Sequence, residues 1–109
     1  MHTVVLRQEL VEAHPWVARE LVIAFTTSKD RAFAAMRDPR RVSLAWFAEA
    51  LAEQRRVLGP DPWAYGLGPN RRALETMIRW SVEQGLVGTS FAPEALFTPT
   101  TVDDLPTYV

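Results

Sequence analysis

Apolar residues recur every three to four positions along most of the chain, the spacing that predicts helices with one apolar face. The longest such pattern starts at Pro15 and runs to about Arg37, and the breaker sequence "RDPRR" ends it at Pro39. Before it, "RQELVEAH" predicts one or two helical turns that stop at Pro15. The first part of the chain is therefore expected to be a short helix followed by a long one.

The rest of the chain predicts two more helices of substantial length and a short terminal one. Ser43 is a plausible N-cap for a helix that Gly59 closes, and the next helix is expected from about Pro69 to Gln84. Gly85 then occupies a position that favours left-handed backbone, with Leu86 providing an apolar contact after it. The segment "PEALF" begins with a proline, as short helices often do.

Several large apolar residues are assigned packing positions by this pattern. Phe25 and Leu51 lie mid-stripe on their helices and are expected in the core. Trp16 is expected to pack from the first turn of the long helix, and Trp63 and Tyr65 to anchor the loop "GPDPWAYGLGPN". Stacking of Trp63 and Tyr65 on a ligand is the alternative for that loop.

One segment does not fit a purely helical plan. The β-branched run in "HTVVLR" predicts a strand over Thr3–Leu6, yet no second strand follows anywhere in the sequence. Because a lone strand leaves its backbone N–H and C=O groups unpaired, this segment needs a sheet from elsewhere. The predicted fold class is mostly α, with one N-terminal strand, three main helices and a short terminal helix, in a single unit over residues 1–109.

Composition excludes several classes of function. The chain has 109 residues and a formal charge of −1, so it offers no basic field for nucleic acid, and it has no Cys for disulfides or thiolate sites. No run approaches the roughly 20 apolar residues that span a bilayer, and acidic residues stand where a signal peptide has its apolar core. We therefore expect a cytoplasmic protein that binds neither nucleic acid nor membrane.

The sequence carries no motif for a metal or a cofactor, and we expect neither. His2 and His14 are twelve residues apart and outside any HExxH pattern. The glycines of "YGLGPN" follow no strand, and Pro69 removes an N–H that a phosphate cradle would use. Residue chemistry alone thus stops at a helical unit with an unpaired strand.

The segments "HTVVLR", "HPW", "DPWAYG" followed by "N", and "EQGL" occur here in an order and spacing that resemble the C-terminal part of the 4,5-dihydroxyphthalate decarboxylase family. The resemblance extends from His2 to about Asp104. It implies the α/β type II periplasmic-binding-protein-like fold, in which two lobes enclose a ligand cleft. The chain would be the C-terminal segment of that larger protein, and "HTVVLR" would join a sheet whose other strands lie upstream.

The resemblance also implies non-oxidative removal of a carboxyl group from a hydroxylated aromatic dicarboxylate. His2, at the strand that would point into the cleft, is the first candidate for the proton donor or carboxylate-holding residue, with a structural histidine as the alternative. Arg7 is a second substrate-binding candidate, with a surface ion pair as its alternative. The chain alone is expected to be inactive, because the upstream lobe residues are missing.

Two other function classes stay open. A solute-binding protein or ligand sensor of the same fold would close on a carboxylate without catalysis, since fold does not fix function. An autonomous helical interaction module would pair its apolar strand across a symmetry axis. In either case a free apolar N-terminal strand favours self-association of the isolated chain.

Overall fold

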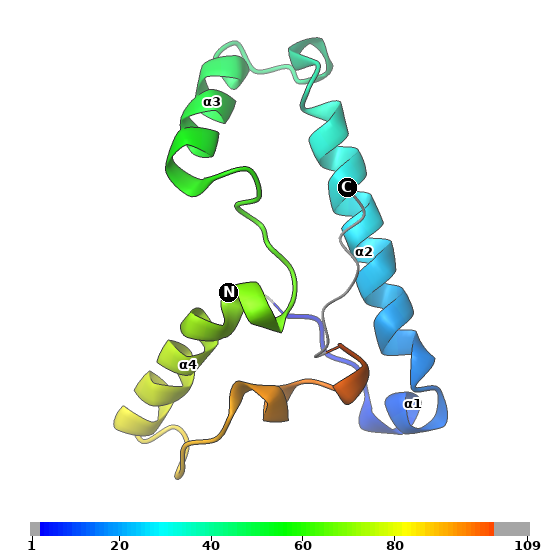
Figure 1. Ribbon diagram of the computed structural model, residues 1–109, viewed down its shortest axis with the longest axis vertical. Coiled ribbons are helices and arrows are strands. Elements are labelled where there is room, and N and C mark those ends of the chain that lie inside the picture. Colours follow the sequence, from blue (N-terminus) through cyan, green and yellow to red (C-terminus); the bar gives the residue numbers. More distant parts are fainter. Residues whose placement is uncertain (1–2, 102–109) are drawn as a thin grey trace. The chain divides into compact units, whose positions relative to one another are not determined.

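The computed structural model describes residues 3–101, and the regular elements in this range are all helical (Figure 1). The four α-helices are α1 (Gln8–Ala13), α2 (Trp16–Ala35), α3 (Phe47–Leu58) and α4 (Leu67–Glu83). Three short 3₁₀ turns are η1 (Pro39–Arg41), η2 (Pro93–Leu96) and η3 (Pro99–Thr101). The expected mostly α-helical chain is confirmed for the described residues.

The predicted strand over Thr3–Leu6 is wrong for this chain, because residues 3–101 contain no strand. Val4 and Val5 are 65% and 86% exposed, and the chain then turns into α1, where the Arg7 carbonyl accepts hydrogen bonds from the amides of Leu10 and Val11. A strand exists only as part of a ladder. With no second extended segment to pair with, β-branched residues alone do not make one.

The boundary between α1 and α2 agrees with the sequence. His14 ends α1 and Pro15 precedes the first residue of α2, so the proline occupies the place where its missing N–H costs nothing. The α2 helix then runs for 20 residues to Ala35, and Pro39 begins the next turn, close to the predicted break.

The predicted start of α3 at Ser43 is wrong by several residues. Trp46 occupies the N-cap position, and the Phe47 amide donates to the Leu44 carbonyl, so a turn precedes the helix and Ser43 lies outside it. The predicted end is confirmed: Gly59 follows Leu58 with φ 81°, a backbone conformation that side chains with a Cβ resist.

The α4 helix starts at Leu67, two residues before the predicted Pro69, which is accommodated in its first turn. It ends as the sequence indicates, at Gly85 with φ 72°. The amide of Leu86 donates to the Ser81 carbonyl across this turn, but its side chain is 75% exposed. The apolar contact predicted for Leu86 is therefore absent, and the glycine turn ends the helix without it.

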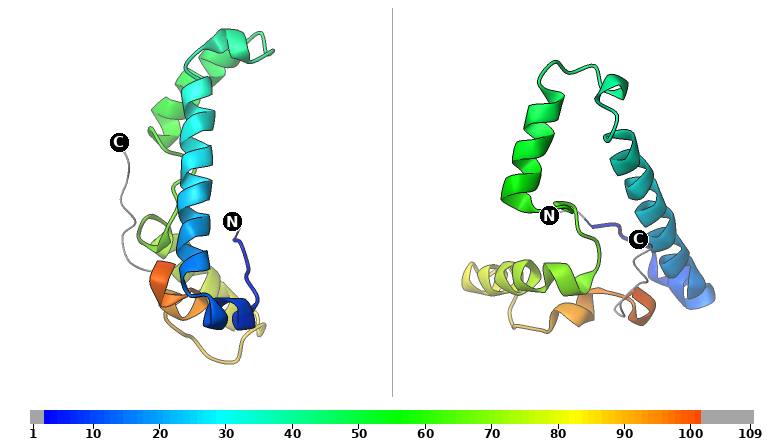
Figure 2. Two further views of the ribbon diagram at one scale, coloured as in Figure 1. Left: turned by 90° about the vertical axis from the view of Figure 1, so that its right-hand side faces the viewer. Right: turned by 45° about the horizontal axis from the view of Figure 1, so that its top comes forward.

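The chain divides into two units, which are described separately. Unit 1 comprises residues 1–22 and 65–109, and in its described part α4 packs against η2 (Figures 1 and 2). Its buried residues are Ala18, Leu67, Leu74, Ile78 and Pro93.

Unit 2 comprises residues 23–64, and none of its side chains is fully buried. Phe25 is 43% exposed and Leu51 half-buried, so the predicted core position of Phe25 is wrong. A helix stripe becomes a core only when a facing element covers it. The apolar stripe of α2 is correctly placed on the helix but only partly covered.

Candidate functional site

Of the two residues singled out from the sequence, the structure places Arg7. His2 lies outside the described residues. Arg7 precedes α1 and is exposed, and among residues 3–101 no side chain pairs with its guanidinium. Arg7 is therefore a cation with open donors, which a carboxylate can occupy.

The second histidine lies beside a tryptophan at the junction of α1 and α2. The rings of His14 and Trp16 meet edge to face with centroids 6.2 Å apart. Trp16 is 63% exposed, so it does not pack into a neighbouring element as the sequence suggested. The pair is an exposed contact between neighbouring side chains at the junction.

A group of polar contacts in unit 2 connects α2 to the loop after α3, and sequence reasoning missed it. Lys29 Nζ donates to Asp61 Oδ2 at 2.7 Å and to the Trp63 carbonyl at 3.3 Å. The other Asp61 oxygen accepts from the Trp63 amide at 3.2 Å. The Lys29 side chain is only 12% exposed, and its ammonium lies 5.9 Å from the centre of the Phe33 ring.

We call this group of contacts the Lys29–Asp61 clamp. It holds the loop after α3, which the sequence analysis expected Trp63 and Tyr65 to anchor. Trp63 and Tyr65 are 62% and 46% exposed, so they do not anchor the loop by burial. One signal for the clamp was available: Lys29 is the only lysine among twelve basic residues. A short Asp-Pro-Trp turn also favours a carboxylate that receives backbone N–H groups.

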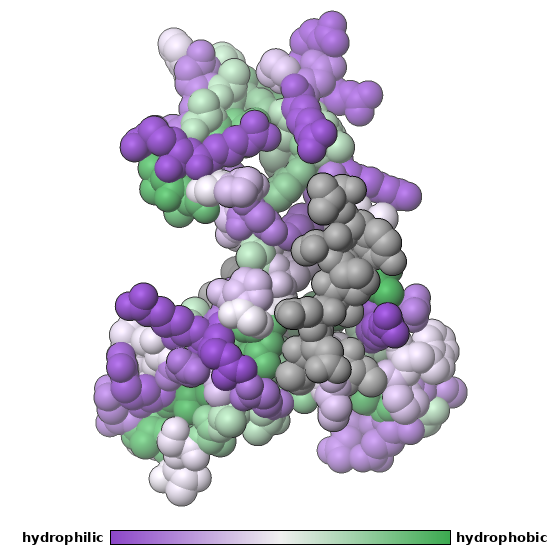
Figure 3. Space-filling view, viewed as in Figure 1, coloured by the Kyte–Doolittle hydropathy of each residue, from purple (hydrophilic) through white to green (hydrophobic). Residues whose placement is uncertain are grey.

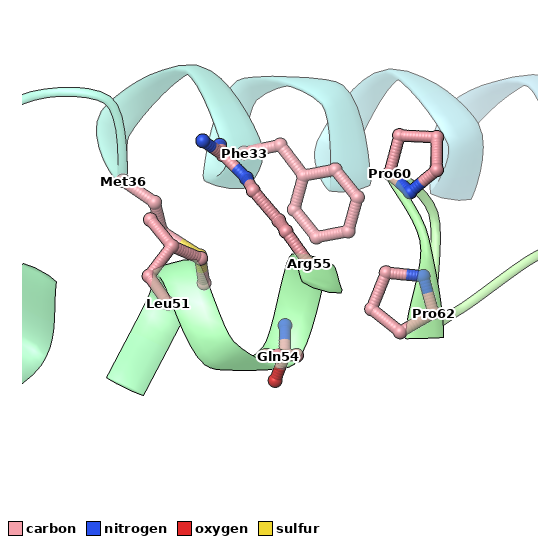
Figure 4. Close-up of a pocket in the computed structure, with 7 residues that line it drawn as sticks. All are labelled: Phe33, Met36, Leu51, Gln54, Arg55, Pro60 and Pro62. Carbon is pink, nitrogen blue, oxygen red and sulfur yellow. The ribbon is translucent and has the colours of Figure 1, made fainter. Parts of the chain in front are cut away.

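A small hollow lies between α2, α3 and the loop after α3 (Figure 4). Seven residues from three segments line it. Phe33 belongs to α2 and Met36 follows that helix directly. The others are Leu51, Gln54 and Arg55 of α3, and Pro60 and Pro62 of the loop after α3. Its cavity volume is only about 20 Å³. A cavity of about 10–15 Å³ is needed to hold one water molecule. The hollow is therefore far too small to enclose an aromatic dicarboxylate.

The described residues offer no alternative centre for metal chemistry. Within residues 3–101 no three His, Asp or Glu side chains converge closely enough to hold an ion. In the same range no helix is long and apolar enough to cross a membrane.

Comparison with known proteins gives one informative match. The chain is 32% identical over 105 residues to a 4,5-dihydroxyphthalate decarboxylase of Comamonas testosteroni. The alignment covers 94% of this chain but only 32% of that protein, and it corresponds to the C-terminal part. No family model and no solved structure matches. The resemblance noted in the sequence is thus confirmed as homology to about the last third of the relative.

Proposed function

We propose that this chain, homologous to the C-terminal part of a 4,5-dihydroxyphthalate decarboxylase, supplies that part of a protein that decarboxylates a hydroxylated aromatic dicarboxylate. The observation that carries the proposal is an alignment over 94% of the chain at 32% identity. Because the chain spans 32% of the relative's length, the reaction requires polypeptide beyond these residues. The small, open hollow in unit 2 is consistent with that requirement.

The reaction needs a proton donor and groups that hold the carboxylates. A ring hydroxyl pushes electrons into the ring, the carbon bearing the carboxylate takes a proton, and the C–C bond breaks to release CO₂. We assign the proton or one carboxylate to His2. Arg7 binds a carboxylate, since its exposed guanidinium has no partner among the described residues.

The proposal includes the two-lobed α/β fold of type II periplasmic-binding proteins, with the missing lobes upstream. Residues 3–6 then join a sheet of one lobe, which accounts for an apolar segment that is exposed and unpaired here. Without that sheet, the same segment pairs with a second copy. Sedimentation of the isolated chain tests this, and Val5→Lys is expected to reduce self-association; a monomeric wild-type chain at high concentration contradicts it.

A fusion protein tests the function. This chain is joined to the part of the Comamonas relative that precedes the matched region, and turnover of 4,5-dihydroxyphthalate is measured; we call this protein the fusion. We expect activity from the fusion, none from the chain alone, and loss of activity in folded His2→Ala. Arg7→Ala is expected to raise KM about tenfold, the loss of one hydrogen bond between charged groups.

Arg19→Ala is the matched control, because Arg19 is an exposed arginine of α2. A fusion that binds the dicarboxylate without turnover favours the solute-binding alternative. Decarboxylation by the chain alone contradicts the requirement for the missing lobes.

A further inference from the structure

The α4 helix carries two apolar stripes, and the described residues of unit 1 bury only one of them. Leu67, Leu74 and Ile78 are at most 5% exposed and form most of the core of the unit. Ala73, Met77 and Trp80 follow the i, i+4, i+7 spacing on an adjacent part of the helix and are exposed, Met77 by 39% and Trp80 by 53%. We call these three residues the outer stripe.

Charge is kept away from the outer stripe. The charged residues of α4 lie on the other side of the helix and are Arg71, Arg72, Glu75, Arg79 and Glu83. Two ion pairs run along that side, Arg71–Glu75 and Arg79–Glu83, each at 3.7 Å. In Figure 3 the surface over α4 accordingly combines hydrophilic and hydrophobic areas. The helix thus has one charged side and one uncharged side, and the described residues of unit 1 leave the uncharged side exposed.

The residue types of the outer stripe fit contact with protein. Trp and Met are enriched at the buried centres of protein interfaces. An exposed Trp on a helix, by contrast, leaves a large apolar surface in contact with water. An apolar triplet at this spacing is the pattern by which a helix seats in an apolar groove of another polypeptide. Because the outer stripe borders the buried stripe, a partner placed there would extend the existing core.

We propose that the outer stripe of α4 is the docking surface for the polypeptide that corresponds to the upstream two thirds of the relative. The inference rests on the proposed function only for the identity of the partner. The argument for this occupant is length: the chain aligns over 94% of itself with 32% of the relative. The helix that corresponds to α4 in the relative therefore belongs to a much longer chain, whose remaining polypeptide is available to cover this side.

The test compares the isolated chain with the fusion by hydroxyl-radical footprinting. Met and Trp oxidise readily, so mass spectrometry reads Met77 and Trp80 individually. We expect oxidation of both to fall several-fold in the fusion relative to the isolated chain. Trp80→Ala is expected to lower the Tm of the fusion by several degrees without lowering that of the isolated chain, and Trp80→Phe to restore most of the loss.

Arg72→Ala, an exposed position of α4 outside the stripe, is the matched control and should change neither Tm. Equal oxidation in both proteins overturns the proposal. So does protection of Met77 and Trp80 in the isolated chain as its concentration rises, because a second copy is then the occupant. An insoluble fusion, when the relative itself is soluble, shows that the surface does not fit. A fusion with protected Trp80 but no decarboxylation refutes the proposed function and leaves the docking surface standing.

Discussion

Replacing Asp61 by Ala should loosen the loop after α3 by removing one side of the Lys29–Asp61 clamp. The carboxylate accepts from Lys29 Nζ at 2.7 Å and from the Trp63 amide at 3.2 Å. Both bonds are lost in Asp61→Ala, and the Lys29 ammonium, with a side chain only 12% exposed, keeps its hydrogen bond to the Trp63 carbonyl but loses the charge of Asp61.

The magnitude follows from the exposure of the two partners. A hydrogen bond to a charged group contributes about 1.5–3 kcal/mol when buried and an exposed ion pair about 0–1 kcal/mol. The Asp61 side chain is 43% exposed, which places the clamp between these limits. We expect Asp61→Ala to lower the free energy of unfolding by about 1–2 kcal/mol, and a double-mutant cycle with Lys29→Met to give a coupling of about 1 kcal/mol.

Urea unfolding followed by circular dichroism measures these values, and Trp fluorescence reports the loop. Glu53→Ala is the matched control, because the Glu53–Arg56 pair is exposed on both sides, and it should leave the midpoint unchanged. Additive effects of Asp61→Ala and Lys29→Met would refute the reasoning, since they would show that the two groups do not interact in solution.

Three further predictions concern stability. Leu74→Ala, at a site 2% exposed, should cost about 2–5 kcal/mol, whereas Phe25→Ala, at 43% exposure, should cost about 1 kcal/mol or less; urea unfolding of both variants checks the contrast. The hydrogen bond from Arg71 holds the pKa of Glu94 below that of an ordinary Glu carboxyl, so this pair stabilises fully above the ordinary pKa and loses its effect as pH falls through the lower folded-state pKa. An NMR titration should show a lowered midpoint in the wild type and its return toward the ordinary pKa of Glu in Arg71→Ala. Gly85→Ala should cost about 1 kcal/mol, because φ is 72° and the added methyl group would meet no neighbour, so backbone strain alone sets the cost; an unchanged thermal midpoint would contradict it.

The helix boundaries could be predicted because the proline and glycine residues that set them act locally. Pro15, Pro39, Gly59 and Gly85 act through their own backbone, and each marks a boundary close to the observed one. The failures involve partners that are distant or missing. Val4 and Val5 have strand-like side chains, and the sequence already showed that no second strand follows; the β-branched run was nevertheless assigned a strand, which the described residues do not form.

The site was less predictable than the fold. Arg7 lies before α1 and not at the end of a strand, and its role in binding stays a prediction. Lys29 and Asp61 are 32 residues apart and meet only after α2, α3 and the loop have formed. Burial of Trp16, Trp63 and Phe25 was overestimated for a related reason. The spacing of apolar residues identifies the side of a helix that can be buried. Whether another element packs against that side depends on the rest of the polypeptide.

The lack of a buried side chain in unit 2 has a consequence for the timescales on which the helices open. Amide hydrogens exchange when their helix unfolds locally, and the free energy of that opening follows the buried apolar layer that holds the helix. The α4 amides are backed by Leu74 and Ile78, whereas the half-buried Leu51 is the nearest equivalent on α3. Native-state exchange should therefore release α3 in a separate, earlier opening, so that one melting temperature describes only the more stable part of the chain.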